Sequence, residues 1–239
     1  MDPEQFLQAL KERGLVLSEE QVAQFATYFH ELRRVNEQMN LTRITSQEDV
    51  YLKHFYDSLT PLIVFKEAFT GSKKLCDVGS GAGFPGIPLK ILQPQLKLTI
   101  VDSLAKRLQF LKELTAILGL KNVELVHGRV EDIAHQAQWR ETFDLTTARA
   151  VAKLNVLSEY CLPLVRKGGQ MIALKGPRSN EELAHADRAL KLLGGKLSQV
   201  RDFTLPDSTE QRTLIQITKV KPTPGKYPRQ AGTPNRKPL

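Results

Sequence analysis

The chain has 239 residues, of which 41% are hydrophobic and 25% charged, a composition typical of globular proteins that excludes a mostly disordered or fibrous chain. At about 150 residues per domain, this length suits one large domain whose core needs neither a disulfide nor a metal. Two distant cysteines, Cys76 and Cys161, without a Cys-x-x-Cys motif, disfavour a disulfide framework and a structural zinc site, so we expect no metal.

The N-terminal sequence and the hydropathy pattern bear on the compartment. The first ten residues include Asp2 and Glu4 and lack the basic and apolar segments of a signal peptide. No apolar run approaches the roughly 18 residues that a membrane span needs. We therefore expect a cytoplasmic protein that does not enter a membrane.

The net charge is +8, and much of the basic surplus lies at the C-terminus. The last 21 residues contain six basic residues and no acid. The same segment contains five prolines, which disfavour a helix or a central strand. Two interpretations stay open: a solvated, flexible terminus, or a basic arm that docks on nucleic-acid phosphates.

The N-terminal part of the chain is predicted to be helical. Residues 18–40 form one predicted helix, because apolar residues recur there at helical spacing and Ser18 is a suitable N-cap. A second helix is predicted at 50–65, interrupted near Pro61. We expect residues 1–66 to be a helical extension whose apolar stripe packs on the main domain.

From residue 73 onward, short apolar runs alternate with segments of helical periodicity. Strands are predicted at residues 75–78, 96–102, 123–126, 143–148 and 170–175. Helices are predicted at residues 85–92, 103–120, 153–165 and 180–193. Segments 197–205 and 213–220 are predicted to close the sheet as an antiparallel pair. This alternation predicts an α/β fold with a doubly wound, mostly parallel sheet, which we assign to a main domain at 67–220, followed by a tail at 221–239.

The helix predicted at 103–120 has a start signal and an end signal. Ser103 is its predicted N-cap, and Gly119 lies near its C-terminal end. Its buried face is predicted to consist of four leucines, Leu104, Leu108, Leu111 and Leu118.

A glycine-rich turn, Asp-Val-Gly-Ser-Gly-Ala-Gly-Phe-Pro-Gly at 77–86, follows the first strand of the main domain. Gly79, Gly81 and Gly83 leave bare backbone at the end of a parallel strand, where ligands of open α/β sheets bind. A dinucleotide fingerprint needs glycine in place of the bulky Phe84, and the sequence has no Walker A loop. The spacing therefore favours a ligand with an adenosine but no pyrophosphate, S-adenosylmethionine.

The second predicted strand ends in Asp102, 19 residues after Gly83. A carboxylate at this position can accept both hydroxyls of an adenosine ribose. The alternative is that Asp102 only caps the helix that begins at Ser103. Because the glycine turn and the acid lie in register on one strand–helix–strand unit, together they indicate adenosine binding.

The glycine turn also resembles that of a known family. The sequence Asp-Val-Gly-Ser-Gly-Ala-Gly-Phe-Pro-Gly-Ile-Pro at 77–88 is more specific than the general class I methyltransferase motif. It is similar to that of the small-subunit ribosomal RNA guanine-N7 methyltransferases (RsmG, also called GidB). Further matches extend over nearly the whole chain: Asn40-Leu41-Thr42, Lys53 to Leu59, Val101-Asp102-Ser103, Arg129-Val130-Glu131-Asp132, Ala148-Arg149-Ala150, Leu174-Lys175-Gly176, Tyr227-Pro228-Arg229 and Gly232-Thr233-Pro234.

The resemblance implies a Rossmann-like class I methyltransferase fold and methyl transfer from S-adenosylmethionine to N7 of a guanine in 16S rRNA, position 527 in customary numbering. The implied partner is 16S rRNA within the small ribosomal subunit or an assembly intermediate, and a monomer is the default expectation. The family's cofactor contacts, carried over by motif, fall on Gly79, Phe84, Val130, Glu131 and Arg149. Gly81 and Asp102 are added from the spacing argument alone.

The residues agree with methylation of a ring nitrogen. Guanine N7 has an exposed lone pair and no proton, so its attack on a sulfonium methyl needs no general base. The region after the fourth predicted strand lacks the Asn/Asp-Pro-Pro-Tyr/Phe motif of enzymes that methylate exocyclic amines. Methylation of pyrimidine carbon 5 needs a cysteine nucleophile, and Cys76 and Cys161 both lie in apolar segments.

Arg149 is the candidate catalytic residue, because it follows the fourth strand beside the expected methyl group and can hold a carboxylate, a phosphate or guanine O6. Its alternative role is a structural salt bridge. Glu131 is expected to accept a hydrogen bond from the adenine side, and its alternative is a solvated acid. Asn40, His54 and Lys175 are candidates for substrate contact. Their alternatives are a helix C-cap, a packing histidine and a surface lysine.

Other functions stay open. One alternative is a methyltransferase of the same fold that acts on another RNA or on a small molecule. This alternative predicts that the tail is dispensable for activity. A non-enzymatic RNA-binding module with an adenosine pocket transfers no methyl group. A nicotinamide dehydrogenase is disfavoured by Phe84.

Overall fold

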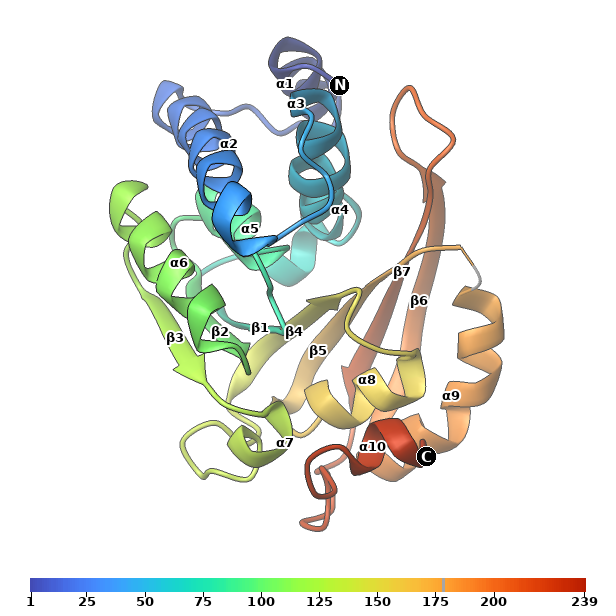
Figure 1. Ribbon diagram of the computed structural model, residues 1–239. Coiled ribbons are helices and arrows are strands. Elements are labelled where there is room, and N and C mark those ends of the chain that lie inside the picture. The colour runs from blue at the N-terminus through green and yellow to red at the C-terminus, as the bar shows by residue number, and fades with distance from the viewer. Residues whose placement is uncertain (178) are drawn as a thin grey trace.

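The computed structural model describes residues 1–177 and 179–239 and is built on a seven-stranded sheet (Figure 1). The strand order is β3-β2-β1-β4-β5-β7-β6. The strands are β1 Lys74–Val78, β2 Lys97–Asp102, β3 Val123–His127, β4 Phe143–Arg149, β5 Val165–Lys175, β6 Gly195–Thr204 and β7 Gln211–Lys219. Strands β1 to β5 pair in parallel, whereas β7 pairs antiparallel with both β5 and β6. The predicted α/β fold with a closing antiparallel pair is confirmed.

Helices occupy most of the remaining chain. The α-helices are α1 Pro3–Glu12, α2 Glu19–Met39, α3 Gln47–Asp49, α4 Asp57–Val64, α5 Gly86–Leu92, α6 Ala105–Ile117, α7 Val130–Ile133, α8 Leu154–Cys161, α9 Ser179–Leu193 and α10 Thr233–Arg236. A π-helix, η1 Val50–Tyr56, precedes α4, and a 3₁₀ helix, η2 Lys66–Phe69, follows it. Among the described residues, no helix combines the length and the apolar character that crossing a membrane requires. Helix α1 lies in the predicted helical extension, although no separate helix was predicted at its position.

Of two predictions for the N-terminal helices, the N-cap at Ser18 is confirmed and the interruption near Pro61 is not. Ser18 caps α2 in a capping box with Gln21, as predicted. The predicted interruption near Pro61 is wrong, because α4 continues through this proline. Proline has no N–H for the carbonyl of Asp57, and the hydroxyl of Thr60 donates to that carbonyl instead, at 2.6 Å.

The start of α6 also differs from the prediction that Ser103 is its N-cap. Helix α6 has no side-chain cap, and Asp102 Oδ1 accepts from the N–H of Leu104, at 2.9 Å, just before the helix begins. Leu104 therefore lies outside the helical stripe and is 50% exposed, whereas the other three predicted leucines are buried. Gly119 follows the helix with φ +66°, as its predicted role at the helix end requires.

Two apolar clusters cover the faces of the sheet. One joins the N-terminal helices, α5 and α6 to the sheet, and the other joins α8 and α9 to it. Within the first, the Tyr28 ring stacks on Phe84, with centroids 5.3 Å apart, and its hydroxyl donates to the carbonyl of Ala82 at 2.6 Å. The N-terminal helices therefore support the glycine turn directly.

The tail is folded onto the body, so the interpretation as a solvated, flexible terminus is wrong. Tyr227 and Pro228 are buried. The Arg140 guanidinium donates to the carbonyls of Thr223 and Tyr227, both at 2.9 Å. Helix α10 forms despite the prolines, because Pro234 lies in its first turn, where a backbone N–H has no helical partner.

Candidate functional site

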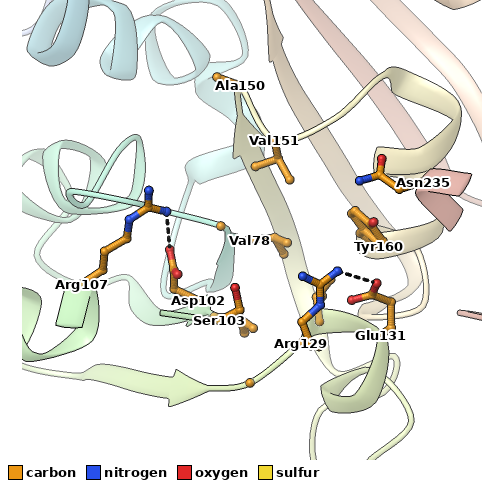
Figure 2. Close-up of a pocket in the computed structure, with 14 residues that line it drawn as sticks. Val78, Asp102, Ser103, Arg107, Arg129, Glu131, Ala150, Val151, Tyr160 and Asn235 are labelled. Carbon is orange, nitrogen blue, oxygen red and sulfur yellow. Dashed lines mark hydrogen bonds and ion pairs between the residues drawn. The ribbon is translucent and has the colours of Figure 1, made fainter. Parts of the chain in front are cut away.

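A cavity of about 280 Å³ opens at the carboxyl ends of β1, β2, β3 and β4 (Figure 2). Its walls come from the ends of β1 and β2, the loops after β3 and β4, and helices α6, α7, α8 and α10. Strand β1 pairs with β2 on one side and with β4 on the other, so the chain reverses its direction of progress across the sheet at this point. Ligands of doubly wound sheets bind at such a switch point.

The backbone of the glycine turn borders the cavity, and at Gly79 a side chain would collide with a residue of the cavity wall. Gly79 has φ +69°, and a Cβ there would lie 2.9 Å from Val151 Cγ2. Gly81 has φ +62° and open space around the position of a Cβ. The buried carboxylate of Asp77 holds the turn, because its Oδ2 accepts from the Ser80 hydroxyl at 2.6 Å and from the Gly86 N–H at 2.8 Å. Burial raises the pKa of Asp77 to about 6.

Asp102 joins the glycine turn to the start of α6 and lies on the cavity wall. Its Oδ2 accepts from the N–H of Gly81 at 3.1 Å, and its Oδ1 accepts from the N–H of Leu104. Arg107 Nη1 is 3.7 Å from Oδ2. Asp102 therefore accepts a backbone hydrogen bond just before α6 and also faces the cavity, and its contact with a ribose stays a prediction.

Glu131, in the first turn of α7 after β3, is 1% exposed, so the reading as a solvated acid is wrong. Its Oε1 accepts from the N–H of Gly232 at 2.9 Å and from Arg129 Nη2 at 3.1 Å. Burial by itself would raise the pKa of Glu131, but these hydrogen bonds and the Arg129 charge outweigh it and hold the pKa below its ordinary value. The carboxylate is therefore ionised and connects the cavity to the tail.

Phe84 and Arg149 lie in a second cluster, outside the lining of the cavity. The Phe84 ring stacks on both Tyr28 and His54, with the His54 centroid 4.5 Å away. The Arg149 guanidinium lies 5.0 Å from the Phe84 ring centroid and donates to the Lys53 carbonyl at 2.8 Å. Phe84 therefore acts in packing, and does not itself face the ligand space.

Arg149 ties the end of β4 to the N-terminal helices. Its guanidinium donates to His54 Nδ1 at 3.0 Å and lies 3.3 Å from Asp57 Oδ2, which Arg212 also contacts at 3.1 Å. These contacts correspond to the structural salt bridge that was its alternative role. The two residues that follow Arg149, Ala150 and Val151, do line the cavity.

The three candidates for substrate contact lie apart from the cavity lining. Asn40 is the C-cap of α2 in the left-handed conformation, with φ +49°, which was its alternative role. His54 is buried between Arg149 and Thr42, and burial together with the Arg149 charge lowers its pKa to about 3. Lys175 Nζ donates to the Ala152 carbonyl at 2.7 Å and pairs with Glu182 at 2.6 Å.

The structure thus brings four of the predicted cofactor residues to one cavity: Gly79, Asp102, Val130 and Glu131. Gly81 contributes through its hydrogen bond to Asp102. Sequence reasoning missed Tyr160 and Asn235, which also line the cavity. No local motif marks either residue, because Tyr160 reaches the cavity from α8 and Asn235 from α10, far from the glycine turn in sequence.

The cavity fits S-adenosylmethionine in its chemistry. Asp102 presents an acceptor for ribose hydroxyls, and its position is fixed by two backbone donors. Because Gly79 has no Cβ, the space beside Val151 at the cavity wall stays open. Val78 and Val130 add apolar surface for an uncharged base.

Comparisons with known proteins agree with this geometry. The family model described as GidB, rRNA small subunit methyltransferase G, matches residues 21–215. Ribosomal RNA small subunit methyltransferase G from Lactobacillus helveticus is 61% identical over 239 residues, the full length of both chains. The protein of the same name from Oceanobacillus iheyensis is 52% identical, again over the full length of both.

Solved structures show the same fold at low identity. A 16S rRNA (adenine(1408)-N(1))-methyltransferase mutant from Catenulisporales acidiphilia has a TM-score of 0.51 and 18% identity, over 66% of this chain and 90% of that chain. A ribosomal protein L11 methylase from Lactobacillus delbrueckii subsp. bulgaricus has a TM-score of 0.54 and 16% identity, over 71% and 79%. The predicted class I methyltransferase fold is confirmed, and the chain belongs to the GidB family, rRNA small subunit methyltransferase G.

Proposed function

We propose that this protein transfers a methyl group from S-adenosylmethionine to N7 of a guanine in 16S rRNA, at position 527 in customary numbering. The observation that carries the proposal is the cavity beside the glycine turn, with the Asp102 carboxylate on its wall, in a chain of the GidB family. The substrate is 16S rRNA in the small subunit or an assembly intermediate, and the site of action is the cytoplasm. A monomer suffices for this chemistry.

Asp102 and the glycine turn would hold the nucleoside. Each oxygen of Asp102 already accepts one backbone hydrogen bond, which fixes the carboxylate without using all of its acceptor positions. The ribose hydroxyls are donors that match those positions. Glu131 and Val130, at the start of α7, lie on the side assigned to the adenine.

Methyl transfer to guanine N7 requires positioning more than proton transfer. S-adenosylmethionine would supply an electrophilic methyl on a sulfonium. Attack by the lone pair of N7, which bears no proton, would form the N–CH₃ bond, break the S–CH₃ bond and release S-adenosylhomocysteine. The acids of the cavity agree with this requirement, because Asp102 and Glu131 are both engaged in hydrogen bonds to backbone N–H groups. Oriented proximity can contribute about 7–11 kcal/mol to such a reaction.

Arg149 fits the role of a positioning residue. Its contacts with Lys53, His54 and Asp57 fix the end of β4, and the next two residues of the chain line the cavity. The Arg149 side chain would therefore set the shape of the wall at Val151 through the backbone. A base reached at this edge must be unstacked, as in a loop of the RNA.

The proposal is tested by incubating the protein with radiolabelled S-adenosylmethionine and, in parallel, deproteinised rRNA and small subunits. Borohydride–aniline cleavage then maps any N7-methylguanine. A single modified guanine in 16S rRNA is the expected result. Label in another RNA or in a small molecule contradicts the substrate assignment, and binding without transfer indicates a non-enzymatic module.

A further inference from the structure

The C-terminal segment, residues 220–239, contributes one side of the cavity. Helix α10 packs against α8, and Asn235 of α10 lies at the cavity edge with its side chain turned toward the cavity (Figures 1 and 2). The family match ends at residue 215, so it does not cover this segment.

Two buried acids of the main domain hold this segment in place. Glu131 accepts from the N–H of Gly232 at 2.9 Å, three residues before Asn235. Glu159 of α8 is fully buried and pairs with Arg229, whose Nη2 lies 2.7 Å from Oε2 and whose backbone N–H donates to Oε1 at 2.8 Å. Buried charges are costly unless they are paired, so these contacts specify one position for the segment.

Part of the positive charge of the last 21 residues, 219–239, is used inside the molecule. Lys219, the last residue of β7, is fully buried and pairs with Glu141 at 3.0 Å, and Arg229 pairs with Glu159. The basic residues that remain exposed include Arg236 and Lys237. Asn235 follows the anchored residues Arg229 and Gly232 in sequence and precedes the exposed Arg236 and Lys237. A substitution at Asn235 therefore leaves both the anchors and the exposed charges intact.

The lining differs between the two ends of the cavity. Asp102 lies at one end, and Glu131, Tyr160 and Asn235 lie at the other (Figure 2). The carboxylates are acceptors only, whereas the amide of Asn235 offers both a donor and an acceptor. An adenine edge presents the complementary pair, an amino donor beside a ring-nitrogen acceptor.

We propose that the C-terminal segment is a wall of the methyl-donor cavity and that Asn235 contacts the adenine of S-adenosylmethionine. This inference rests on the proposed function. It assigns the tail to binding of the methyl donor, in contrast to the interpretation as an arm that docks on RNA phosphates.

The test measures binding of S-adenosylhomocysteine to the full-length protein by titration calorimetry, without any RNA. Asn235→Ala is expected to weaken binding about 3- to 10-fold, the effect of losing one or two hydrogen bonds. Arg236→Ala is the matched control, because it removes a neighbouring exposed side chain of α10 that does not line the cavity, and its affinity should equal that of the wild type.

The outcomes separate the two proposals. If the wild type does not bind S-adenosylhomocysteine, the proposed function fails. If the wild type binds and Asn235→Ala binds equally well, the role of Asn235 is overturned. A loss of affinity for rRNA in Asn235→Ala, with unchanged affinity for S-adenosylhomocysteine, also overturns it and supports the RNA arm.

Amide hydrogen exchange measures the wall directly. The Gly232 N–H is the donor to Glu131, so its exchange reports opening of the segment. Saturation with S-adenosylhomocysteine is expected to slow this exchange at least severalfold in the wild type and less in Asn235→Ala. Equal exchange with and without the ligand would show that the segment takes no part in binding.

Discussion

The Arg149 guanidinium donates a hydrogen bond to Nδ1 of His54, at 3.0 Å. Because arginine has no acceptor, this contact fixes the imidazole as the tautomer with its proton on Nε2, which donates to Thr42 Oγ1 at 2.9 Å. Burial and the Arg149 charge lower the pKa of His54 to about 3. His54 is therefore neutral near pH 7 and acts in the alignment of η1 on β4.

This depressed pKa predicts a pH dependence of stability. Below its ordinary pKa of about 6.5, His54 binds a proton in the unfolded state but stays neutral in the folded state, so the free energy of unfolding falls as the pH is lowered from 6.5 toward 3. Lowering the pH from 7 to 5 is expected to reduce the contribution of His54 to the free energy of unfolding by about 2 kcal/mol. Urea unfolding at the two pH values measures it.

His54→Gln is the control, because glutamine does not titrate and should lose this contribution. The comparison is needed because the pKa of Asp77, raised to about 6, acts in the opposite direction between pH 3.8 and 6 in both proteins. An NMR titration that places the imidazole midpoint near 6.5 would contradict the prediction.

Arg149→Ala is expected to lower the free energy of unfolding by about 3 kcal/mol, because it removes one partner of a buried ion pair and leaves Asp57 with Arg212 alone. Urea denaturation measures the effect, with Arg188→Ala on the exposed side of α9 as the control. Unchanged stability combined with lost methyl transfer would return Arg149 to the role of a catalytic residue.

Asp102→Ala is expected to weaken binding of S-adenosylhomocysteine by about 1.5–3 kcal/mol, the usual net value of hydrogen bonds to a charged group. Calorimetry measures the affinity, and thermal melting verifies that the variant is folded. Asp132→Ala removes an exposed acid from α7 and should bind normally. Equal affinities for the two variants would remove Asp102 from the site.

The glycine turn offers a matched pair of substitutions. Gly81→Ala introduces only the strain of a positive φ, about 1 kcal/mol, because the space around its Cβ is open. Gly79→Ala adds a contact of 2.9 Å with Val151 and is expected to reduce stability and ligand binding further. Adding Val151→Ala to Gly79→Ala should recover part of the loss, whereas it should not help Gly81→Ala. Identical effects of the two glycine substitutions would argue against a close approach at Gly79.

The sequence alone was enough to predict most strands, the order of strands and helices, and the place of the glycine turn. These features depend on local patterns: apolar runs, helical spacing and glycine where the backbone needs a positive φ. Asp102 was found in the same way, because a parallel strand delivers its last residue to the edge where ligands bind.

Only the tertiary structure decided the roles of Arg149, Glu131 and the tail. The partners of Arg149 at His54 and Asp57 lie more than 90 residues away in sequence, and Gly232 lies 101 residues from Glu131. Composition described the tail correctly as basic and rich in proline. It could not show that Arg229 and the Gly232 N–H of the tail donate to the buried acids Glu159 and Glu131. A charged side chain becomes a ligand contact, an anchor or a solvated group according to what packs around it, and that is settled when distant segments meet.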